Sequence, residues 1–280
     1  MPFLELFDET LDINSTENYE LSVQLSPDSL AFCILDTIRN KYVLLRSFES
    51  DENKYLSATR LDELISKDDF LLKRYKKINL VMPSGKFTLV PAQLFDPGKK
   101  DEYFSFNHST EEDELILSNK INDPDAYIVF SVLKPLYEVA AGRFPGVLPF
   151  HHTKPLMLHV AHHKNSVNGN YVHIHVGKEY FNLVIFEGVT LKFCNSFTYR
   201  NYNDILYYVL NTFKNLDIKQ EETVHLSGHT EKYDDLSSAF SIYIRTLKYS
   251  EPAGSFTFSY VFNDIIVHRF LNLFTAVNCE

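Results

Sequence analysis

The chain has 280 residues, 45% of them hydrophobic, which is enough to bury the cores of two domains of about 100–150 residues each. Its net charge of −10 at pH 7 argues against nonspecific binding to nucleic acid or to an anionic membrane, because neutralising phosphates requires clustered Lys and Arg. The three cysteines are too few and too scattered for a disulfide framework or a zinc site.

The first recognisable elements lie in residues 19–48, where apolar and polar residues alternate in three runs separated by two short turns. Alternation at period two places one set of side chains on a buried face of a sheet. Residues 19–48 therefore predict a three-stranded antiparallel meander. Its apolar set includes Val23, Leu25, Leu30, Phe32 and Ile34.

A helical signal and a strand signal follow this meander. Apolar residues at helical spacing predict a helix over 59–75. Residues 78–85 predict a buried strand that ends in a turn, and in 86–95 the ring of Pro91 is suited to open a short helix.

Residues 101–163 have no counterpart elsewhere in the chain, and we interpret them as material inserted between two related halves. The Pro-rich part of this region predicts irregular structure. In chain order, we expect two strands around an acidic loop over 101–121, a strand over 125–133, a helix over 134–144, an irregular segment over 144–155 and a strand over 155–163.

The second half repeats the pattern of the first. Residues 171–197 again alternate in three runs, and a helix over 201–216, a strand over 222–228 and a further element over 233–244 follow. This repetition predicts an internal duplication. Apolar spacing over 262–277 predicts a helix packed on the second lobe. The residues that lie 151 positions after the apolar set of the first meander are Ile174, Val176, Phe181, Leu183 and Ile185.

Two copies of the order β-β-β-α-β-α, with insertions in the first, resemble the actin, hexokinase and Hsp70 superfamily. The chain looks like the bacterial branch that includes the cell-division protein FtsA and the pilus-assembly protein PilM. It is most similar to a bacterial family of unknown function that is grouped with these actin-like ATPases. The resemblance implies a mixed α/β (α+β) chain with a duplicated ribonuclease-H-like/actin-like ATPase fold, in which each of two lobes has a mixed sheet flanked by helices. It places the first lobe at 1–150, with inserted strands at about 101–121, and the second at 151–280.

In that superfamily, a hairpin turn in each lobe approaches the nucleotide phosphates through glycine backbone, and an Asp beside each turn serves Mg²⁺ or the attacking water. A later Gly-Gly turn lies beside the adenosine. The resemblance places the first turn on Gln24 and Ser26, and the second on His175, Gly177 and Lys178. It places the adenosine turn on Gly228 and His229.

This chain departs from the family pattern at each turn. Gln24 and His175 replace the two Asp residues, Pro27 removes a backbone donor, and Glu179 adds negative charge near a phosphate. Without the Asp residues, Mg-ATP hydrolysis lacks electrostatic support, so we expect no catalytic residues and no cofactor. The alternative is a genuine ATP-binding ATPase or sugar-kinase-like enzyme that uses ATP and Mg²⁺. Lys178 and Lys86, each near one of the expected turns, are candidates to compensate for a missing metal, but we favour the interpretation that both are exposed turn lysines.

Histidines are concentrated between residues 151 and 175, where seven of the eleven lie. His173 and His175 are two positions apart on an expected strand and so share one face, and His159 is expected on another strand. Converging imidazoles can bind Zn²⁺, but the spacing matches no zinc motif and no Cys or Glu completes one. We expect no metal, with these three histidines as weak candidates, and favour a polar patch facing the interlobe cleft or solvent.

These features predict an actin-like protein with degenerate nucleotide motifs that acts as a non-catalytic adaptor or scaffold in bacterial cell division or envelope assembly. We expect a protein partner that the sequence does not identify, allow for a homo-oligomer, and expect no nucleic-acid partner. The first 20 residues lack a basic start and a long apolar core, and no apolar run approaches the ~20 residues that span a bilayer. We therefore expect a cytoplasmic protein without stable membrane insertion.

Overall fold

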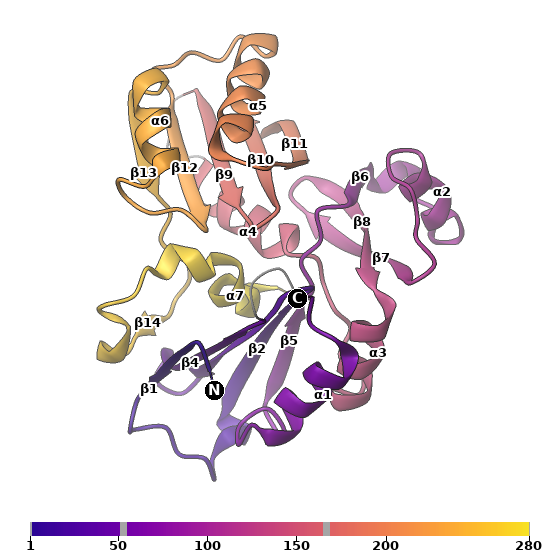
Figure 1. The fold of residues 1–280 in the computed structure, drawn as a ribbon, viewed down its shortest axis with the longest axis vertical. Coiled ribbons are helices and arrows are strands. Elements are labelled where there is room, and N and C mark those ends of the chain that lie inside the picture. The colour runs from indigo at the N-terminus through magenta and orange to yellow at the C-terminus, as the bar shows by residue number, and fades with distance from the viewer. Residues whose placement is uncertain (1, 51–54, 165–168, 280) are drawn as a thin grey trace.

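The computed structural model describes residues 2–50, 55–164 and 169–279. Two lobes, each built around a sheet, lie one above the other, and a smaller third sheet lies to one side between them (Figure 1). The chain is thus a mixed α/β protein with several sheets flanked by helices, as the sequence predicts.

The sheet of the first lobe contains the predicted meander. Its three strands are antiparallel neighbours, and a fourth strand lies parallel to the first of them. A short strand from the N-terminus extends the other edge. In spatial order the sheet reads β1 (Leu4–Phe7), β4 (Lys41–Glu49), β3 (Ser29–Asp36), β2 (Tyr19–Ser26) and β5 (Lys77–Val81).

The sheet of the second lobe has the same local topology. Its meander is antiparallel, and the next strand again lies parallel to the first strand of the meander. The matching order is consistent with the duplication that the sequence predicts, which stays a prediction. In spatial order the sheet reads β11 (Thr190–Thr198), β10 (Tyr180–Glu187), β9 (Asn170–Val176), β12 (Thr223–Gly228) and β13 (Thr246–Tyr249).

The third sheet carries the inserted segment, and here one prediction is wrong. Residues 101–121 were expected to form two strands, but the first part forms helix α2 (Lys100–Ser105) and only the second part forms a strand. Phe104 is fully buried beneath this helix and fixes it to the sheet. The sheet order is β6 (Phe87–Pro91), β8 (Asp125–Leu133) and β7 (Glu114–Asn122), with short 3-10 turns at Ala92–Leu94 and Pro97–Lys99.

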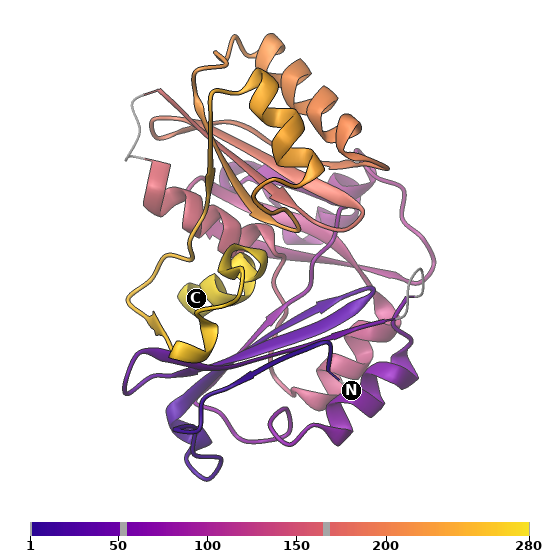
Figure 2. The same cartoon turned by 60° about the vertical axis from the view of Figure 1, so that its left-hand side comes forward.

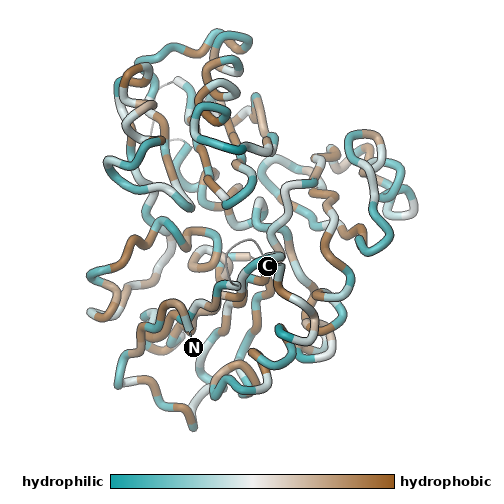
Figure 3. The backbone as a smooth tube through the Cα atoms, viewed as in Figure 1, coloured by the Kyte–Doolittle hydropathy of each residue, from teal (hydrophilic) through white to brown (hydrophobic). Residues whose placement is uncertain are grey.

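Both faces of the first sheet are covered. Helices α1 (Ala58–Lys67) and α3 (Lys134–Arg143) pack on one face, against residues such as Phe32 and Ile34. Residues near the C-terminus pack on the other face, against Cys33. Strand β3 is consequently buried almost throughout, and Figure 3 shows that the strands of both main sheets are largely hydrophobic.

Helix α1 is shorter than the predicted segment 59–75. The Ser57 side chain accepts a hydrogen bond from the Arg60 amide and begins the helix. At the other end, Asp68 has an extended backbone and its carboxylate accepts from the Phe70 and Leu71 amides. These local hydrogen bonds compete with the helical ones and end the helix before the last apolar residues.

The second sheet is covered by α5 (Tyr202–Asn215) and α6 (Asp235–Tyr243) on one face and by α4 (Thr153–His163) on the other (Figure 2). A strand over 155–163 was predicted, and this prediction is wrong. Leu156, Met157 and Val160 are buried on one side of a helix. A short apolar run does not distinguish a strand from a buried helix by periodicity alone.

The C-terminal prediction is also wrong, in both shape and location. In place of one helix over 262–277, the chain forms the short strand β14 (Thr257–Phe258), the short helix α7 (Leu271–Thr275) and 3-10 turns. Strand β14 pairs with β4, and Phe274 packs on the first sheet rather than on the second lobe. The chain therefore returns to the first lobe. The 3-10 turns are η5 (Tyr260–Phe262), η6 (Val267–Phe270) and η7 (Ala276–Asn278), and η1 (Thr16–Asn18) precedes β2.

The division into lobes at residue 150 stays a prediction, because the last segment contacts the first sheet although it follows the second in sequence. Helix α4 lies against both the second sheet and α7, so it joins the two parts of the molecule. Among the residues that the structure describes, no helix combines the length and the apolar character needed to cross a bilayer.

Candidate functional site

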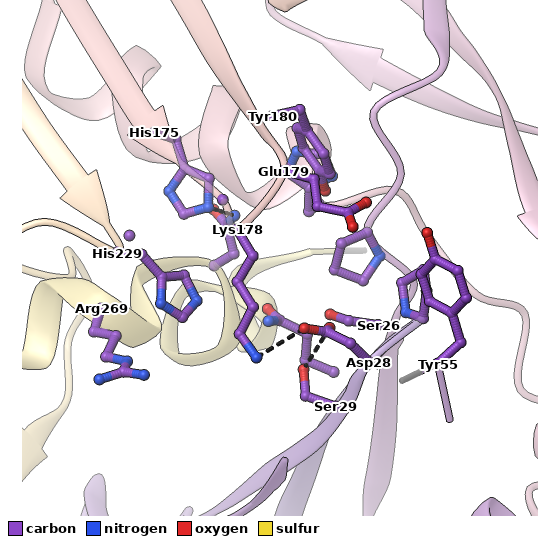
Figure 4. A pocket seen from close by; sticks show the side chains of 17 residues that line it. Ser26, Asp28, Ser29, Tyr55, His175, Lys178, Glu179, Tyr180, His229 and Arg269 are labelled. Carbon is purple, nitrogen blue, oxygen red and sulfur yellow. Dashed lines mark hydrogen bonds and ion pairs between the residues drawn. The ribbon is translucent and has the colours of Figure 1, made fainter. Parts of the chain in front are cut away.

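Two hairpin loops face each other across the space between the lobes (Figure 4). Pro27–Asp28 joins β2 to β3, and Gly177–Glu179 joins β9 to β10, where the Gly177 amide donates to the Tyr180 carbonyl oxygen and so encloses Lys178 and Glu179. They are separated by the same 151 positions as the two meanders. These are the loops at which the superfamily resemblance places the nucleotide phosphates.

The cavity between the loops brings every predicted nucleotide-site residue together. It has a volume of about 110 Å³ and is bordered by both lobes and by the C-terminal segment. The residues chosen from the sequence therefore line a single cavity, and their role in binding a nucleotide stays a prediction. The predicted residues that line it are Gln24, Ser26, His175, Gly177, Lys178, Gly228 and His229.

Ion pairs join the two loops to each other. Lys178 Nζ lies 2.7 Å from Asp28 Oδ2 and 3.4 Å from Glu49 Oε2. Arg269 on η6 contacts the other oxygen of Glu49 at 3.2 Å. Burial by itself lowers the pKa of Lys178, but the hydrogen bond and charge of Asp28, together with Glu49, raise it above its usual value. We call Asp28, Glu49, Lys178 and Arg269 the interlobe latch.

Neutral side chains occupy the two positions where the superfamily has Asp. Gln24 lines the cavity from the first sheet. His175 has both ring nitrogens engaged, Nδ1 with Ser227 Oγ at 2.9 Å and Nε2 with Asn272 Nδ2 at 3.0 Å. Burial, followed by the neighbouring His152 and His229, lowers the pKa of His175 well below its usual value, so it is uncharged.

Tyr180 fills the side of the cavity next to the third sheet. Its ring lies so close to Gly85 that a Cβ at that glycine would be 3.0 Å from the ring. On the other side its ring centroid is 5.6 Å from that of His152, whose Nε2 contacts Asn182 Oδ1 at 2.7 Å. Burial lowers the pKa of His152 to about 4. The cavity wall here is aromatic and uncharged.

The retained glycines have local structural reasons. A Cβ at Gly177 would lie 2.8 Å from the Tyr180 carbonyl oxygen of its own hairpin. Gly228 has φ +84°, and a Cβ there would lie 2.1 Å from the Val176 carbonyl oxygen. Close backbone packing at the ends of β9 and β12 thus requires both glycines without any ligand.

The side chains at these loops do not fit a magnesium-bound triphosphate. Asp28 and Glu179 would repel phosphate oxygens, Pro27 has no N–H to donate, and no carboxylate stands at the positions of Gln24 and His175. The volume of about 110 Å³ is also below the ~300–1,000 Å³ typical of ligand pockets, and below the ~150 Å³ of an engineered cavity that holds benzene.

The histidines lie differently from the prediction in two respects. His159 and His173 do not belong to a patch facing the interlobe cleft or solvent, because both are buried. His159 is on helix α4 rather than on a strand, because residues 153–163 are helical. His173 and His175 do share a face of β9, since both contact Ser227 Oγ. Across 2–50, 55–164 and 169–279, no group of three or more His, Cys, Asp or Glu is arranged to hold a metal ion.

Sequence reasoning missed several residues of the site. Asp28 had a usable signal, since it stands in the loop equivalent to that of Lys178 and has the opposite charge. Arg269 and Asn272 had none, because they reach the cavity from a C-terminal segment that was expected on the other lobe. His152 was counted with the histidine cluster but was not assigned to the site.

A larger groove lies beside the interlobe latch, between the third sheet, helix α3 and the β10–β11 hairpin. Its volume is about 830 Å³, within the usual range for binding sites. Lys86, Glu114, Leu136, Tyr180, Phe197 and Tyr208 are among the residues that line it. We call this the side groove.

Comparisons with known proteins agree with the fold. A family model described as "Protein of unknown function (DUF3822)" matches residues 8–247. No curated protein matches the sequence significantly. A solved structure from Bacteroides thetaiotaomicron, described as having an actin-like ATPase fold and unknown function, is similar with a TM-score of 0.82 and 24% identity, over 97% of this chain and 100% of that one. The PilM–PilN type IV pilus biogenesis complex contains a similar chain, with a TM-score of 0.60, 13% identity and coverage of 92% and 98%. The architecture is therefore the actin-like ATPase fold.

Proposed function

The chain belongs to the protein family of unknown function DUF3822, and we propose that it is a non-catalytic adaptor that keeps the actin-like fold without its nucleotide chemistry. The observation that carries this proposal is the interlobe latch. The two loops that hold phosphates in the superfamily are here bonded to each other, through Lys178 and Asp28 at 2.7 Å. A cleft closed by the protein's own charges has no need of a nucleotide to hold the lobes together.

The donor set of the cavity supports this proposal. Phosphoryl transfer depends on a metal ion and on positioning groups, and the cavity offers Gln24 and a neutral His175 where metal-binding carboxylates are needed. The two cations near the loops, Lys178 and Arg269, are already paired with carboxylates. An incoming phosphate would have to displace Asp28 and Glu49.

We expect Mg-ATP, ADP and AMP to leave the melting temperature unchanged, because none of them has a place between the joined loops. Thermal-shift measurement at millimolar nucleotide tests this, with isothermal titration as the direct check. A ligand at 100 times its Kd would stabilise the native state by about 2.7 kcal/mol, a shift that is easily measured.

The Lys178→Ala variant separates the two candidate functions. If the protein were an ATPase that uses Lys178 in place of a metal, wild type would bind ATP at micromolar concentration and the variant would bind it more weakly. For the adaptor, neither protein responds to nucleotide, and the variant loses only the small stability of a solvent-accessible ion pair, about 0.2–1 kcal/mol. Micromolar ATP binding by wild type would overturn the proposal.

We propose the side groove as the surface that a protein partner occupies. It is a large concave surface next to the interlobe latch. The charge of the side chains that line it indicates the charge of the partner segment. Among the described residues that line it, Lys86 pairs with Glu114 at 3.0 Å, whereas the exposed carboxylates Asp113 and Glu179 make no ion pair. The groove therefore favours a basic segment of a partner protein.

Charge reversal tests this assignment. We expect the variant Asp113→Lys with Glu179→Lys to lose a partner that wild type captures from cell lysate, measured by quantitative mass spectrometry. The matched control reverses two exposed carboxylates outside the groove, Glu221→Lys with Glu251→Lys, and should capture the partner as wild type does. Equal capture by both variants would exclude the side groove.

We place this adaptor in the bacterial cytoplasm, in cell division or envelope assembly. The support is the similarity of fold to a chain of the PilM–PilN complex, whose description names type IV pilus biogenesis. Partner proteins or a homo-oligomer fit such a role. Identifying the captured protein in the experiment above would decide which assembly it serves.

A further inference from the structure

Three histidines lie together between helix α4 and the second sheet. The buried His159 comes from α4, the buried His173 from β9 and the half-buried His225 from β12. The ring centroids of His159 and His173 are 5.5 Å apart in an edge-to-face arrangement, and His225 stacks on Tyr171 at 4.3 Å. We call these three residues the imidazole cluster.

Several nitrogens of this cluster lack hydrogen bonds. Both ring nitrogens of His159 are buried without a partner, as are His173 Nδ1 and His225 Nε2. His159 and His173 are 1% and 0% exposed. A buried polar atom without a hydrogen-bond partner destabilises the native state, so several of them in one place suggest a role other than packing.

The hydrogen-bond chain from the interlobe cavity ends in this cluster. The Asn272 amide nitrogen donates to His175 Nε2, which places the His175 proton on Nδ1, facing Ser227 Oγ. The Ser227 hydroxyl then donates to His173 Nε2 at 2.8 Å. We assign the remaining proton of His173 to Nδ1, which has no partner. The cluster and the cavity are thus ends of one network.

No acid balances this cluster. Among the described residues, no carboxylate makes a hydrogen bond or ion pair with the rings of His159, His173 or His225. The nearby Lys164 is already paired with Asp123 at 2.6 Å. The other titratable or charged groups that face the cluster are His162 and His163 from α4, Tyr171 and His175 from β9 and Lys248 from β13, and α7 contributes Thr275.

Protons have a short route to the cluster. A cavity of about 250 Å³ borders His159 and the exposed His162, and Thr275 and Asn278 of the C-terminal segment line its other side. The ring of His163 lies 4.4 Å from that of His159 and 5.1 Å from that of His162. Protonation therefore does not require prior unfolding of the lobe.

We propose that the imidazole cluster is an acid-sensitive contact. When its histidines take up protons, helix α4 is released from the second sheet. Imidazolium ions at His159 and His173, whose ring centroids are 5.5 Å apart, repel each other in a low dielectric, and no carboxylate among the described residues bonds to either ring. Because α4 also packs on α7, which carries Asn272 into the interlobe cavity, release of α4 loosens the cavity as well.

The sign of the pH dependence follows from the histidine pKa values. Burial, followed by the charges of His163, His225 and His162, lowers the pKa of His159 to about 3. Burial, followed by Lys248 and His163, lowers that of His225 to about 4, and burial lowers that of His173 well below its usual value. When α4 is released, these histidines bind protons that they do not bind while α4 is packed on the second sheet. The packed state is therefore fully populated above pH 6.5 and is lost between pH 6.5 and about 4.

Hydrogen exchange with mass spectrometry tests the proposal. Each histidine released from this environment raises the opening equilibrium about tenfold between pH 7.5 and 5.5. We expect the protection of residues 153–163, corrected for intrinsic exchange, to fall by about 100-fold or more over this range, while the first sheet stays protected. His159→Leu, which removes one titrating group and its unpaired nitrogens, should reduce this response by about tenfold.

The control is His162→Gln, which removes an exposed histidine of the same helix and should leave the response close to that of wild type. If His159→Leu fails to fold, His225→Phe keeps the stacking on Tyr171 and removes a second group of the cluster. The proposal is overturned if α4 stays protected at pH 5.5, or if both cluster variants keep the full pH response.

Discussion

Gly228→Ala is expected to lower the free energy of unfolding by about 3–5 kcal/mol, a loss reserved for substitutions that break a defined structural feature. Gly228 has φ +84°, and the added Cβ would lie 2.1 Å from the Val176 carbonyl oxygen. That oxygen also accepts a hydrogen bond from the His229 amide at 2.7 Å, so the backbone has little freedom to move away. Urea unfolding measures the loss.

Gly188→Ala is the matched control, because Gly188 has φ +56° but nothing lies within 4 Å of the added Cβ. We expect it to cost only the backbone strain, about 1–2 kcal/mol. If Gly228→Ala were as stable as the control, the close packing of the β9 and β12 ends would not explain why this glycine is present. A role beside a bound adenosine would then regain support.

Phe274→Ala is expected to have an effect of similar size, about 3–5 kcal/mol. Phe274 is fully buried between the C-terminal segment and the first sheet, with ring centroids 4.8 Å from Tyr42 and 4.9 Å from Phe258. Removing the ring leaves a cavity among other aromatic residues. The loss is measured by chemical denaturation of the full chain.

A second measurement shows what Phe274 does for the interlobe cavity. Phe274 lies in α7 two residues after Asn272, which contacts His175. We expect hydrogen exchange of residues 267–279 to accelerate in Phe274→Ala, whereas Val277→Ala, which shortens a partly buried side chain of the same segment, costs about 1 kcal/mol and leaves exchange near wild type. Unchanged exchange in Phe274→Ala would show that packing of Phe274 on the first sheet does not hold the segment that carries Asn272 into the interlobe cavity.

The interlobe latch and the imidazole cluster are expected to respond to different solution conditions. The interlobe latch consists of partly exposed ion pairs, which salt weakens, and the imidazole cluster consists of neutral rings, which acid weakens. The latch residues Asp28, Lys178 and Arg269 line the interlobe cavity, and the imidazole cluster is linked to it by hydrogen bonds through Ser227, His175 and Asn272.

Strands were the most predictable part of this fold. The two meanders, β5, β8 and β12 all form where alternation or apolar runs indicated them, because the period of a strand is written into consecutive residues. The loop chemistry was also readable, since a hairpin of known length places Ser26 and Gly177 at equivalent positions. All seven predicted site residues line one cavity, because the parallel pairing of β12 with β9 also brings Gly228 and His229 to the second hairpin.

The errors share a physical cause. Residues 155–163 form a helix because α4 is buried between the second sheet and α7, and such two-sided burial removes the polar positions that identify a helix. Residues 262–277 reach the first sheet because β3 has a second apolar face, which is packed against this distant segment. In both cases a partner far away in sequence takes part, α7 for residues 155–163 and β3 for residues 262–277.

The sequence by itself determined the elements of both meanders and the chemical groups on their turns, because backbone periodicity and loop composition are local properties. Only the tertiary structure decided what those groups do. It paired Lys178 with Asp28, engaged both nitrogens of His175, and gathered His159, His173 and His225 without a carboxylate. Charge pairing and proton affinity depend on distances between segments far apart in the chain, and burial sets both.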